Sequence, residues 1–289
     1  MFAIVGAAGN VGYSTSIALR KAGVPVRAIL RDAAKAAALK ELGCEIALAD
    51  LQDAEALAKA IAGADAVQII VPVALKVRDP AEELRQSIDS IARALAQASP
   101  KRVLAISDYG AHVTDDIGMP TIFHGLEERL GQLNVPRTVL RSAEHMHNWA
   151  RVIPVAMASG NLPTFHNVVD MVFPTIAAAD LGLIAADLLL RPGEKDLDVV
   201  HAEGPRRYSA NDVATALTEL SGRTIHARVV PRSQWKVTFE RNMPGSLAEL
   251  LIKANEAHNR GGLIDVEPNA GEIRYGTTEL IDALQPFLR

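Results

Sequence analysis

Three glycines near the N-terminus have the spacing and surroundings of a phosphate-binding loop. Gly6, Gly9 and Gly12 form a G-x-x-G-x-x-G pattern between the apolar run 2–5 and a helix-like stretch. We expect Gly6 to allow a sharp turn, Gly9 to leave the backbone bare for phosphate oxygens, and Gly12 to let the helix pack closely. The free N–H groups and positive dipole end of that helix would bind a pyrophosphate, whereas the alternative is an ordinary glycine-rich turn. The residues assigned to the cofactor phosphates are Gly6, Ala8, Gly9, Asn10, Val11 and Gly12.

The residue after the second apolar run indicates which dinucleotide binds. When the cofactor is NAD, an acid is expected about 20 residues after the glycine loop, because a carboxylate binds the adenosine ribose hydroxyls. Arg31 occupies that place, after the run 26–30. A guanidinium pairs with a 2′-phosphate, which a carboxylate would repel, and Lys35 could add a second cation. Although Asp32 follows directly, the pattern favours NADP(H), and a solvated loop arginine is the alternative.

Strand-like and helix-like segments alternate through the first half of the chain. Between the apolar runs lie alanine-rich segments of helical period, the clearest with Leu84, Ile88, Ile91 and Leu95 on one face. Such alternation predicts right-handed crossovers and a parallel sheet covered on both faces. We therefore expect an α/β fold with a doubly wound, Rossmann-type parallel sheet. Its predicted strands are 2–5, 26–30, 45–48, 66–71, 102–107 and 136–141.

The pattern changes after Trp149. We predict a domain at 1–150 that binds NAD(P), and at 151–289 mainly a smaller C-terminal α/β region that binds the substrate, with some elements returning to the main sheet. Ser209 is placed to cap one of the helices in this region. The helices predicted here are 177–190, 210–220, 245–258 and 277–288, and the strands are 199–202 and 223–230.

Composition excludes several classes of protein. Of the 289 residues, 49% are hydrophobic and 22% are charged, as in an ordinary globular enzyme. A net charge of −4 gives no reason to expect nucleic-acid binding. The longest apolar stretch, 168–190, contains Asp170, Asp180 and Asp187, so we expect no membrane span. Because the chain begins on a strand, without a signal segment, we expect a cytoplasmic protein.

Several short motifs, in this order, resemble the NmrA-like atypical short-chain dehydrogenase/reductase family. Within that family the chain is most similar to the NADPH-dependent quinone oxidoreductases of the second type. The resemblance implies hydride transfer from NADPH to a small molecule, a quinone or a related conjugated carbonyl, with a homodimer as a candidate assembly. Beyond the glycine loop and Leu30–Asp32, the motifs are Ala49–Asp53, His124–Glu128, Leu140–Ser142, Asp180–Gly182, Gly261–Asp265 and Gly276–Thr278.

The same resemblance implies a path for the cofactor. Asp50 and Leu51 would lie beside the adenine, and Val71-Pro72-Val73 would run toward the nicotinamide ribose. For Asp50 the alternative is a helix cap, and for Val71 it is plain core. The segment after the sixth strand would line the nicotinamide and the substrate. Ser142, Glu144 and His145 are assigned to the cofactor, and His145, His147 and Asn148 to the substrate.

The expected active site departs from that of ordinary short-chain dehydrogenases. Ser107 fits their serine, but Pro120 and His124 stand where their Tyr-x-x-x-Lys pair would be. Since that lysine lowers the pKa of a proton-donating tyrosine, the missing pair argues against alcohol dehydrogenation. A quinone can do without it, because a phenolate is less basic than an alkoxide and water could supply the proton.

Three residues are candidates for the catalytic set: His124, Ser107 and Tyr109. We expect His124 to bind the nicotinamide ribose, and the alternative is that it packs against Leu140. Ser107 is also expected to contact the cofactor. Tyr109 could stack on or hydrogen-bond a flat substrate, and the alternative is loop packing.

Two further hypotheses bear on function. His145, His147 and His166 suggest a metal site, but His-x-His has no third ligand nearby, so we expect no metal. The alternative to an enzyme is a non-catalytic regulatory protein that senses NADP(H) and binds a partner protein, as some NmrA-like proteins do. The absent tyrosine is compatible with both.

Overall fold

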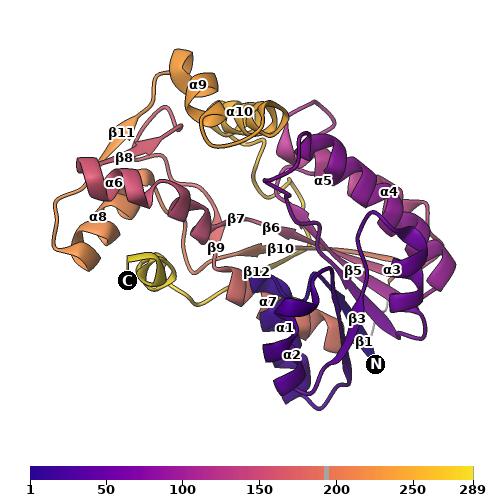
Figure 1. Cartoon of the computed structure of the whole chain (residues 1–289). Coiled ribbons are helices and arrows are strands. Elements are labelled where there is room, and N and C mark those ends of the chain that lie inside the picture. The colour runs from indigo at the N-terminus through magenta and orange to yellow at the C-terminus, as the bar shows by residue number, and fades with distance from the viewer. Residues whose placement is uncertain (192–194, 289) are drawn as a thin grey trace.

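A computed structural model describes residues 1–191 and 195–288, and its core is an eight-stranded sheet (Figure 1). The strand order is β12-β10-β6-β5-β4-β1-β2-β3, and every pair is parallel. This order confirms the predicted Rossmann-type α/β fold. The strands are β1 (Phe2–Val5), β2 (Val26–Leu30), β3 (Glu45–Leu48), β4 (Ala66–Ile69), β5 (Arg102–Asp108), β6 (Arg137–Ser142), β10 (Leu197–Glu203) and β12 (Glu272–Tyr275).

Helices cover both faces of the sheet because the strands are apolar on both sides. Ile4 and Leu104 pack in one apolar cluster with α1, α2 and α7, whereas Ala3 and Ala105 pack in another with α3, α4 and α5 (Figure 1). The predicted face of α4, from Leu84 to Leu95, is buried. The helices are α1 (Asn10–Lys21), α2 (Ala37–Glu41) and α7 (Ala178–Leu190) on the first face, and α3 (Ala54–Ile61), α4 (Pro80–Ala98) and α5 (Met119–Gly131) on the second.

The C-terminal part forms a smaller layer beside the carboxyl ends of the strands (Figure 1). Its third apolar cluster joins α6, α8 and α11 to β8. Ser209 caps α8 as predicted, in a reciprocal capping box with Asp212. Strands β10 and β12, which follow residue 150, extend the main sheet. The division of the chain into two domains at residue 150 stays a prediction. The elements are β7 (Glu144–His145), α6 (Ile153–Ser159), β8 (Asn161–Thr164), β9 (Thr175–Ile176), α8 (Ala210–Ser221), β11 (His226–Val229), α9 (Trp235–Glu240), α10 (Gly245–Arg260) and α11 (Leu280–Leu284), with 3₁₀ turns at Ala33–Lys35, Met146–Arg151, Arg232–Gln234 and Gln285–Leu288.

The family motif Asp180–Gly182 joins three parts of the fold. A Cβ on Gly182 would lie 2.5 Å from the Val11 carbonyl oxygen, so glycine is required where α7 crosses α1. The buried Asp180 carboxylate accepts hydrogen bonds from the Thr277 and Thr278 N–H groups, at 2.8 and 2.7 Å. The last helix therefore begins at Leu280 rather than at the predicted residue 277.

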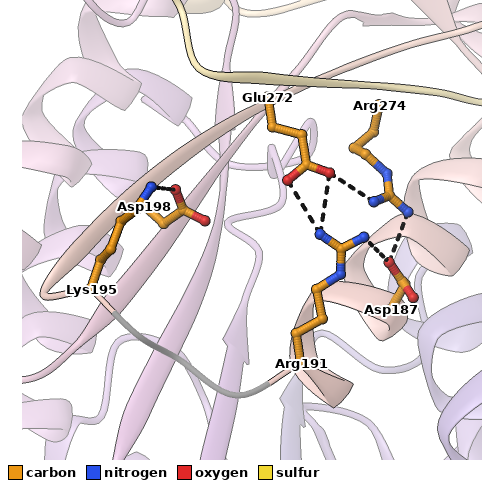
Figure 2. A network of polar contacts seen from close by, with 6 residues as sticks. All are labelled: Asp187, Arg191, Lys195, Asp198, Glu272 and Arg274. Atoms are coloured by element: carbon orange, nitrogen blue, oxygen red, sulfur yellow. Dashed lines mark hydrogen bonds and ion pairs between the residues drawn. The ribbon is translucent and has the colours of Figure 1, made fainter.

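Strand β12 at the sheet edge was not predicted from the sequence. Only the short segment Glu272–Tyr275 pairs with β10, and its polar side chains bind the end of α7. Arg274 donates to Asp187 at 2.7 Å, and Arg191 lies between Glu272 and Asp187 (Figure 2). These ion pairs connect β12 to the end of α7. Each is expected to contribute only about 0–1 kcal/mol to the free energy of unfolding, as surface ion pairs do. Within the described ranges, no helix has the length and apolarity needed to cross a membrane.

Candidate functional site

The glycine loop after β1 has three glycines with three different constraints. Gly6 has φ +74°, and a Cβ there would lie 2.7 Å from Ile70 Cγ2. A Cβ on Gly12 would lie 2.5 Å from the Gly6 carbonyl oxygen, which shows why the helix packs closely only with glycine. A Cβ on Gly9 would meet only the Gly6 oxygen, at an ordinary 3.4 Å. Gly9 therefore faces open space, as expected of a residue that must leave room for a ligand.

The N-terminus of α1 is open to an anion. Gly9 is its N-cap and provides no side-chain cap, and the first turn holds no acidic residue. Ala8, Gly9 and Asn10 are exposed. Within residues 1–191 and 195–288, no hydrogen-bond acceptor engages the N–H groups of Asn10 and Val11. These groups and the helix dipole fit a pyrophosphate.

Cations stand beside this loop at the same edge of the sheet. Because β1 and β2 are parallel and Val5 is opposite Ile29, Arg31 follows β2 close to the level of Gly6. Arg31 and Lys35 are exposed, and no acidic side chain pairs with either of them in the described ranges. The Asp32 carboxylate instead accepts a hydrogen bond from the Ala34 N–H at 2.9 Å and caps a 3₁₀ turn. Asp32, although adjacent to Arg31 in the sequence, therefore caps the 3₁₀ turn and does not pair with the Arg31 guanidinium.

The residues expected along the adenine and ribose follow β3 and β4. Asp50 is exposed and accepts from the Gln52 N–H at 2.9 Å, while the cap of α3 is Asp53. Asp50 therefore does not cap this helix, which was the alternative to its expected place beside the adenine. Val71 is buried, as plain core would be. Pro72 and Val73 are exposed and Leu51 is half-buried, so these side chains can contact a ligand.

Ser107 lies in a buried ionic cluster rather than in an open site. Its hydroxyl donates to Glu127 Oε1 at 2.5 Å, and it is 3% exposed. Arg141 donates to the same carboxylate through Nε at 3.0 Å and Nη2 at 2.7 Å, and it also binds Glu267. The expected contact of Ser107 with cofactor or substrate therefore finds no support here, because Glu127 on α5 occupies its hydroxyl.

Tyr109 is a core residue. It is 1% exposed, its hydroxyl donates to Glu203 Oε1 at 3.2 Å, and its ring meets His201 edge-on with centroids 5.3 Å apart. Burial and the neighbouring Glu203 raise the pKa of the phenol, so it is a poor proton donor to substrate. The packing alternative agrees with the structure, and the expectation of substrate stacking does not.

His124 lies on α5 with one nitrogen engaged and one available. Its Nδ1 is 2.8 Å from the Ala111 carbonyl oxygen, which can only accept a hydrogen bond, so Nδ1 carries the hydrogen and donates. Its Nε2 is 3.7 Å from the exposed Glu128, and the side chain is 27% exposed. Leu140 packs on the other face of the sheet, so packing against Leu140 is wrong as an alternative. The free Nε2 remains able to bind a ribose hydroxyl.

The segment after β6 brings a carboxylate and two imidazoles together. Asn148 donates to Glu144 Oε1 at 3.4 Å, and the rings of His145 and His147 are 5.1 Å apart. Burial raises the pKa of Glu144, and burial with the nearby His147 lowers that of His145 to about 4. Both histidines are therefore neutral hydrogen-bonding groups near pH 7, because burial also lowers the pKa of His147. Ser142 is buried and donates to the Ala143 carbonyl oxygen.

His166 does not join this pair. It stacks on Phe173 with centroids 4.3 Å apart, and burial lowers its pKa to about 4. In the described part of the chain, no group of three or more His, Cys, Asp or Glu side chains could hold a metal ion.

Asp108, at the end of β5, is a polar residue that the sequence analysis did not name. It ends β5 opposite Ser142 of β6 and is half-buried. Burial, followed by the negative charge of Glu144, raises its pKa to about 8. Strand alternation is the signal that could have found it, because consecutive residues of a strand face opposite sides of the sheet.

The strand order, the glycine loop and the open end of α1 define a Rossmann-type, dinucleotide-binding class of protein. The chain belongs to the NmrA-like family, whose sequence model matches residues 1–273. The family predicted from the motifs is therefore confirmed.

Known relatives are NAD(P)H-dependent reductases. Quinone oxidoreductase 2 of Escherichia coli strain K12 is 25% identical over 290 residues, which cover 98% of this chain and 97% of that protein. NAD(P)H azoreductase of Xenophilus azovorans is 25% identical over 254 residues, or 87% and 85% of the two proteins. The structure of the E. coli quinone oxidoreductase with NADPH matches all of both chains with a TM-score of 0.80 at 24% identity. That of Citrobacter sp. triphenylmethane reductase with NADP(H) matches 99% of this chain and 100% of the other, with a TM-score of 0.82 at 20% identity. The structural likenesses establish the fold, and the similarity to the quinone oxidoreductase agrees with the sequence analysis.

Proposed function

We propose that the chain is an NADPH-dependent oxidoreductase that reduces a quinone or a related conjugated carbonyl. The observation that carries the proposal is the open N-terminus of α1, where Gly9 leaves room for a pyrophosphate and the uncapped N–H groups point outward. The family and its NAD(P)H-dependent relatives support the same reaction class.

Each part of the cofactor has residues that fit it. The N–H groups at the start of α1 would hold the pyrophosphate. Arg31 and Lys35, which pair with no acid in the described ranges, would hold a 2′-phosphate. Asp50 and Leu51 would flank the adenine, with Val71, Pro72 and Val73 along the ribose. His124 would accept a hydrogen bond from the nicotinamide ribose through Nε2, and the segment 142–145 would line the nicotinamide.

When bound, NADPH supplies a hydride to the substrate. The chain then has to orient a flat ring beside the nicotinamide and hydrogen-bond its carbonyl oxygens. His147 would do the second task, since it is half-buried and burial lowers its pKa. Asn148 would first have to release its hydrogen bonds to Glu144 and Arg151. Ser107 and Tyr109 have no part in this proposal, because both side chains are buried and hydrogen-bonded elsewhere.

Two measurements test the proposal. Calorimetry with NADPH and NADH should give at least about tenfold tighter binding of NADPH, as expected for a charge-assisted phosphate contact. Oxidation of NADPH should then be catalysed with at least one member of a panel of benzoquinones and naphthoquinones. Tight NADPH binding with no turnover of any quinone would overturn the enzymatic reading and favour the regulatory alternative.

A further inference from the structure

The last residue of β5 presents a carboxyl group to the cofactor edge of the sheet. Leu104 and Ile106 pack with Ile4 and Val11 under α1, so strand alternation puts Asp108 on that same face. Its neighbour Ser107 faces α5 instead, where Glu127 holds it. Asp108 is therefore the side chain that β5 directs toward the side of the phosphate loop, at the edge where ligands of such sheets bind.

Among the described residues, no cation pairs with this carboxyl group. Within the described ranges Asp108 forms no salt bridge, and the arginines of the region have other partners. Arg141 binds Glu127 and Glu267, and Arg151 donates to Asn148 at 3.0 Å. The charged groups that act on Asp108 are Glu144 after β6 and Glu127 on α5, and both are negative.

This environment favours the protonated acid. Burial is the largest cause of the raised pKa and Glu144 is the second, whereas the Tyr109 N–H lowers the pKa and Glu127 adds a smaller rise. The resulting pKa of about 8 means that Asp108 holds a proton at pH 7, when ordinary aspartates have lost theirs. Since Asp108 is half-buried rather than sealed, solvent can restore the proton after it has been given away.

We propose that Asp108 is the proton donor to the substrate, in place of the tyrosine that the chain lacks. This inference rests on the proposed reductase function. The C4–H bond of the nicotinamide breaks and its hydride, with both electrons, goes to the quinone, which becomes a hydroquinone monoanion. The O–H bond of the Asp108 carboxyl breaks, its proton goes to the oxyanion, and a solvent proton later restores the acid. The sum is NADPH, one proton and quinone giving NADP⁺ and hydroquinone, so Asp108 replaces water as the immediate donor.

The protonation of Asp108 can be measured without turnover. In protein labelled with ¹³C-aspartate, one carboxyl resonance should titrate near pH 8, disappear in Asp108→Asn and persist in the exposed control Asp115→Asn. Glu144→Gln should move that titration to lower pH, because it removes a negative charge that disfavours the carboxylate. A resonance of Asp108 that titrates near pH 4 would overturn the inference.

Turnover provides the second readout. With NADPH and a benzoquinone, wild-type kcat/KM should be constant below about pH 7 and fall about tenfold per pH unit above 8. Asp108→Asn, which preserves shape, should bind NADPH as the wild type does but lose about 100-fold in kcat/KM and lose this pH dependence. An unchanged rate and profile in Asp108→Asn would contradict the inference while leaving the reductase function intact. Absence of turnover in the wild type would instead contradict the function, and the ¹³C titration would still decide the state of Asp108.

Discussion

The phosphate-binding half and the β5–β6 half of the cofactor edge are built differently. At the end of β1 the site consists of backbone, with glycines and an open helix end, and after β2 it adds two cationic side chains that pair with no acid among the described residues. At the ends of β5 and β6 it consists of side chains, and several of the polar ones are committed to a buried ionic cluster around Arg141. The first half therefore has little to reorganise when a ligand binds, whereas the second depends on which side chains the fold has left free.

The ionic cluster gives the largest expected effect. Arg141→Ala would leave the half-buried carboxylates of Glu127 and Glu267 without this cation, so the free energy of unfolding should fall by about 3 kcal/mol. Arg191→Ala at the exposed pairs of β12 is the matched control and should cost less than about 1 kcal/mol. Chemical denaturation of both variants measures the difference. Equal and small losses would mean that the cluster does not stabilise the β5–β6 half.

In the phosphate-binding half, one added side chain should abolish binding. Gly9→Val fits the fold, since a Cβ meets only one atom at 3.4 Å, but its side chain would occupy the pyrophosphate space. We expect NADPH affinity to fall by more than about 100-fold with the melting temperature nearly unchanged. Gly12→Ala is the contrasting variant and should lower the melting temperature as well, because its Cβ would lie 2.5 Å from a carbonyl oxygen. Normal NADPH binding by Gly9→Val would show that this loop does not hold the phosphates.

A smaller effect is expected at the 2′-phosphate. Arg31→Ala removes one charge-assisted contact and should weaken NADPH binding by about 1.5–3 kcal/mol, with NADH binding little affected. Lys21→Ala, on the last turn of α1, changes the charge equally and is the control. Calorimetric titration of the variants with both dinucleotides measures the preference. A wild type that binds NADPH and NADH equally would refute the NADP(H) assignment.

The smallest effect is expected at His124. Its ring is held by the Ala111 carbonyl oxygen and can position the ribose, but it does not act as an acid in our proposal. His124→Ala should lower kcat by about tenfold or less through misplacement of the nicotinamide, without a change in the pH profile. Steady-state rates between pH 5.5 and about pH 9 test this. A loss of about 1000-fold would assign the proton transfer to His124 instead of Asp108.

The sequence predicted the fold and the geometry of the glycine loop because both depend on local patterns. The need for glycine at Gly6 and Gly12 follows from the chain direction and the adjacent backbone, and strand–helix alternation fixes the sheet. The family motifs correctly pointed to Asp180 and Gly182, although their role in joining α7 to α1 and to the C-terminal segment appears only in the structure. Edge strand β12 was missed because its sequence is short and charged and its ion-pair partners lie far away in the sequence, on α7.

The β5–β6 half was harder to predict because its chemistry is decided by distant partners. Ser107 is engaged by Glu127 and Tyr109 by Glu203, and neither partner is near in sequence. Asp108 differs from both in having no such partner in the described ranges, and it differs from Ser107 in facing the other side of the sheet. A residue type at a given position thus predicts a site only when the fold leaves that side chain free.

The most direct test of the central proposal is a single-turnover experiment. The wild-type enzyme, saturated with NADPH, is mixed rapidly with excess benzoquinone while NADPH absorbance is followed, beside Gly9→Val under the same conditions. We expect a fast, complete loss of one equivalent of NADPH in the wild type and only the uncatalysed rate in Gly9→Val. If the wild type binds NADPH but its absorbance falls only at the uncatalysed rate, the assignment of this chain as a quinone-reducing oxidoreductase is contradicted.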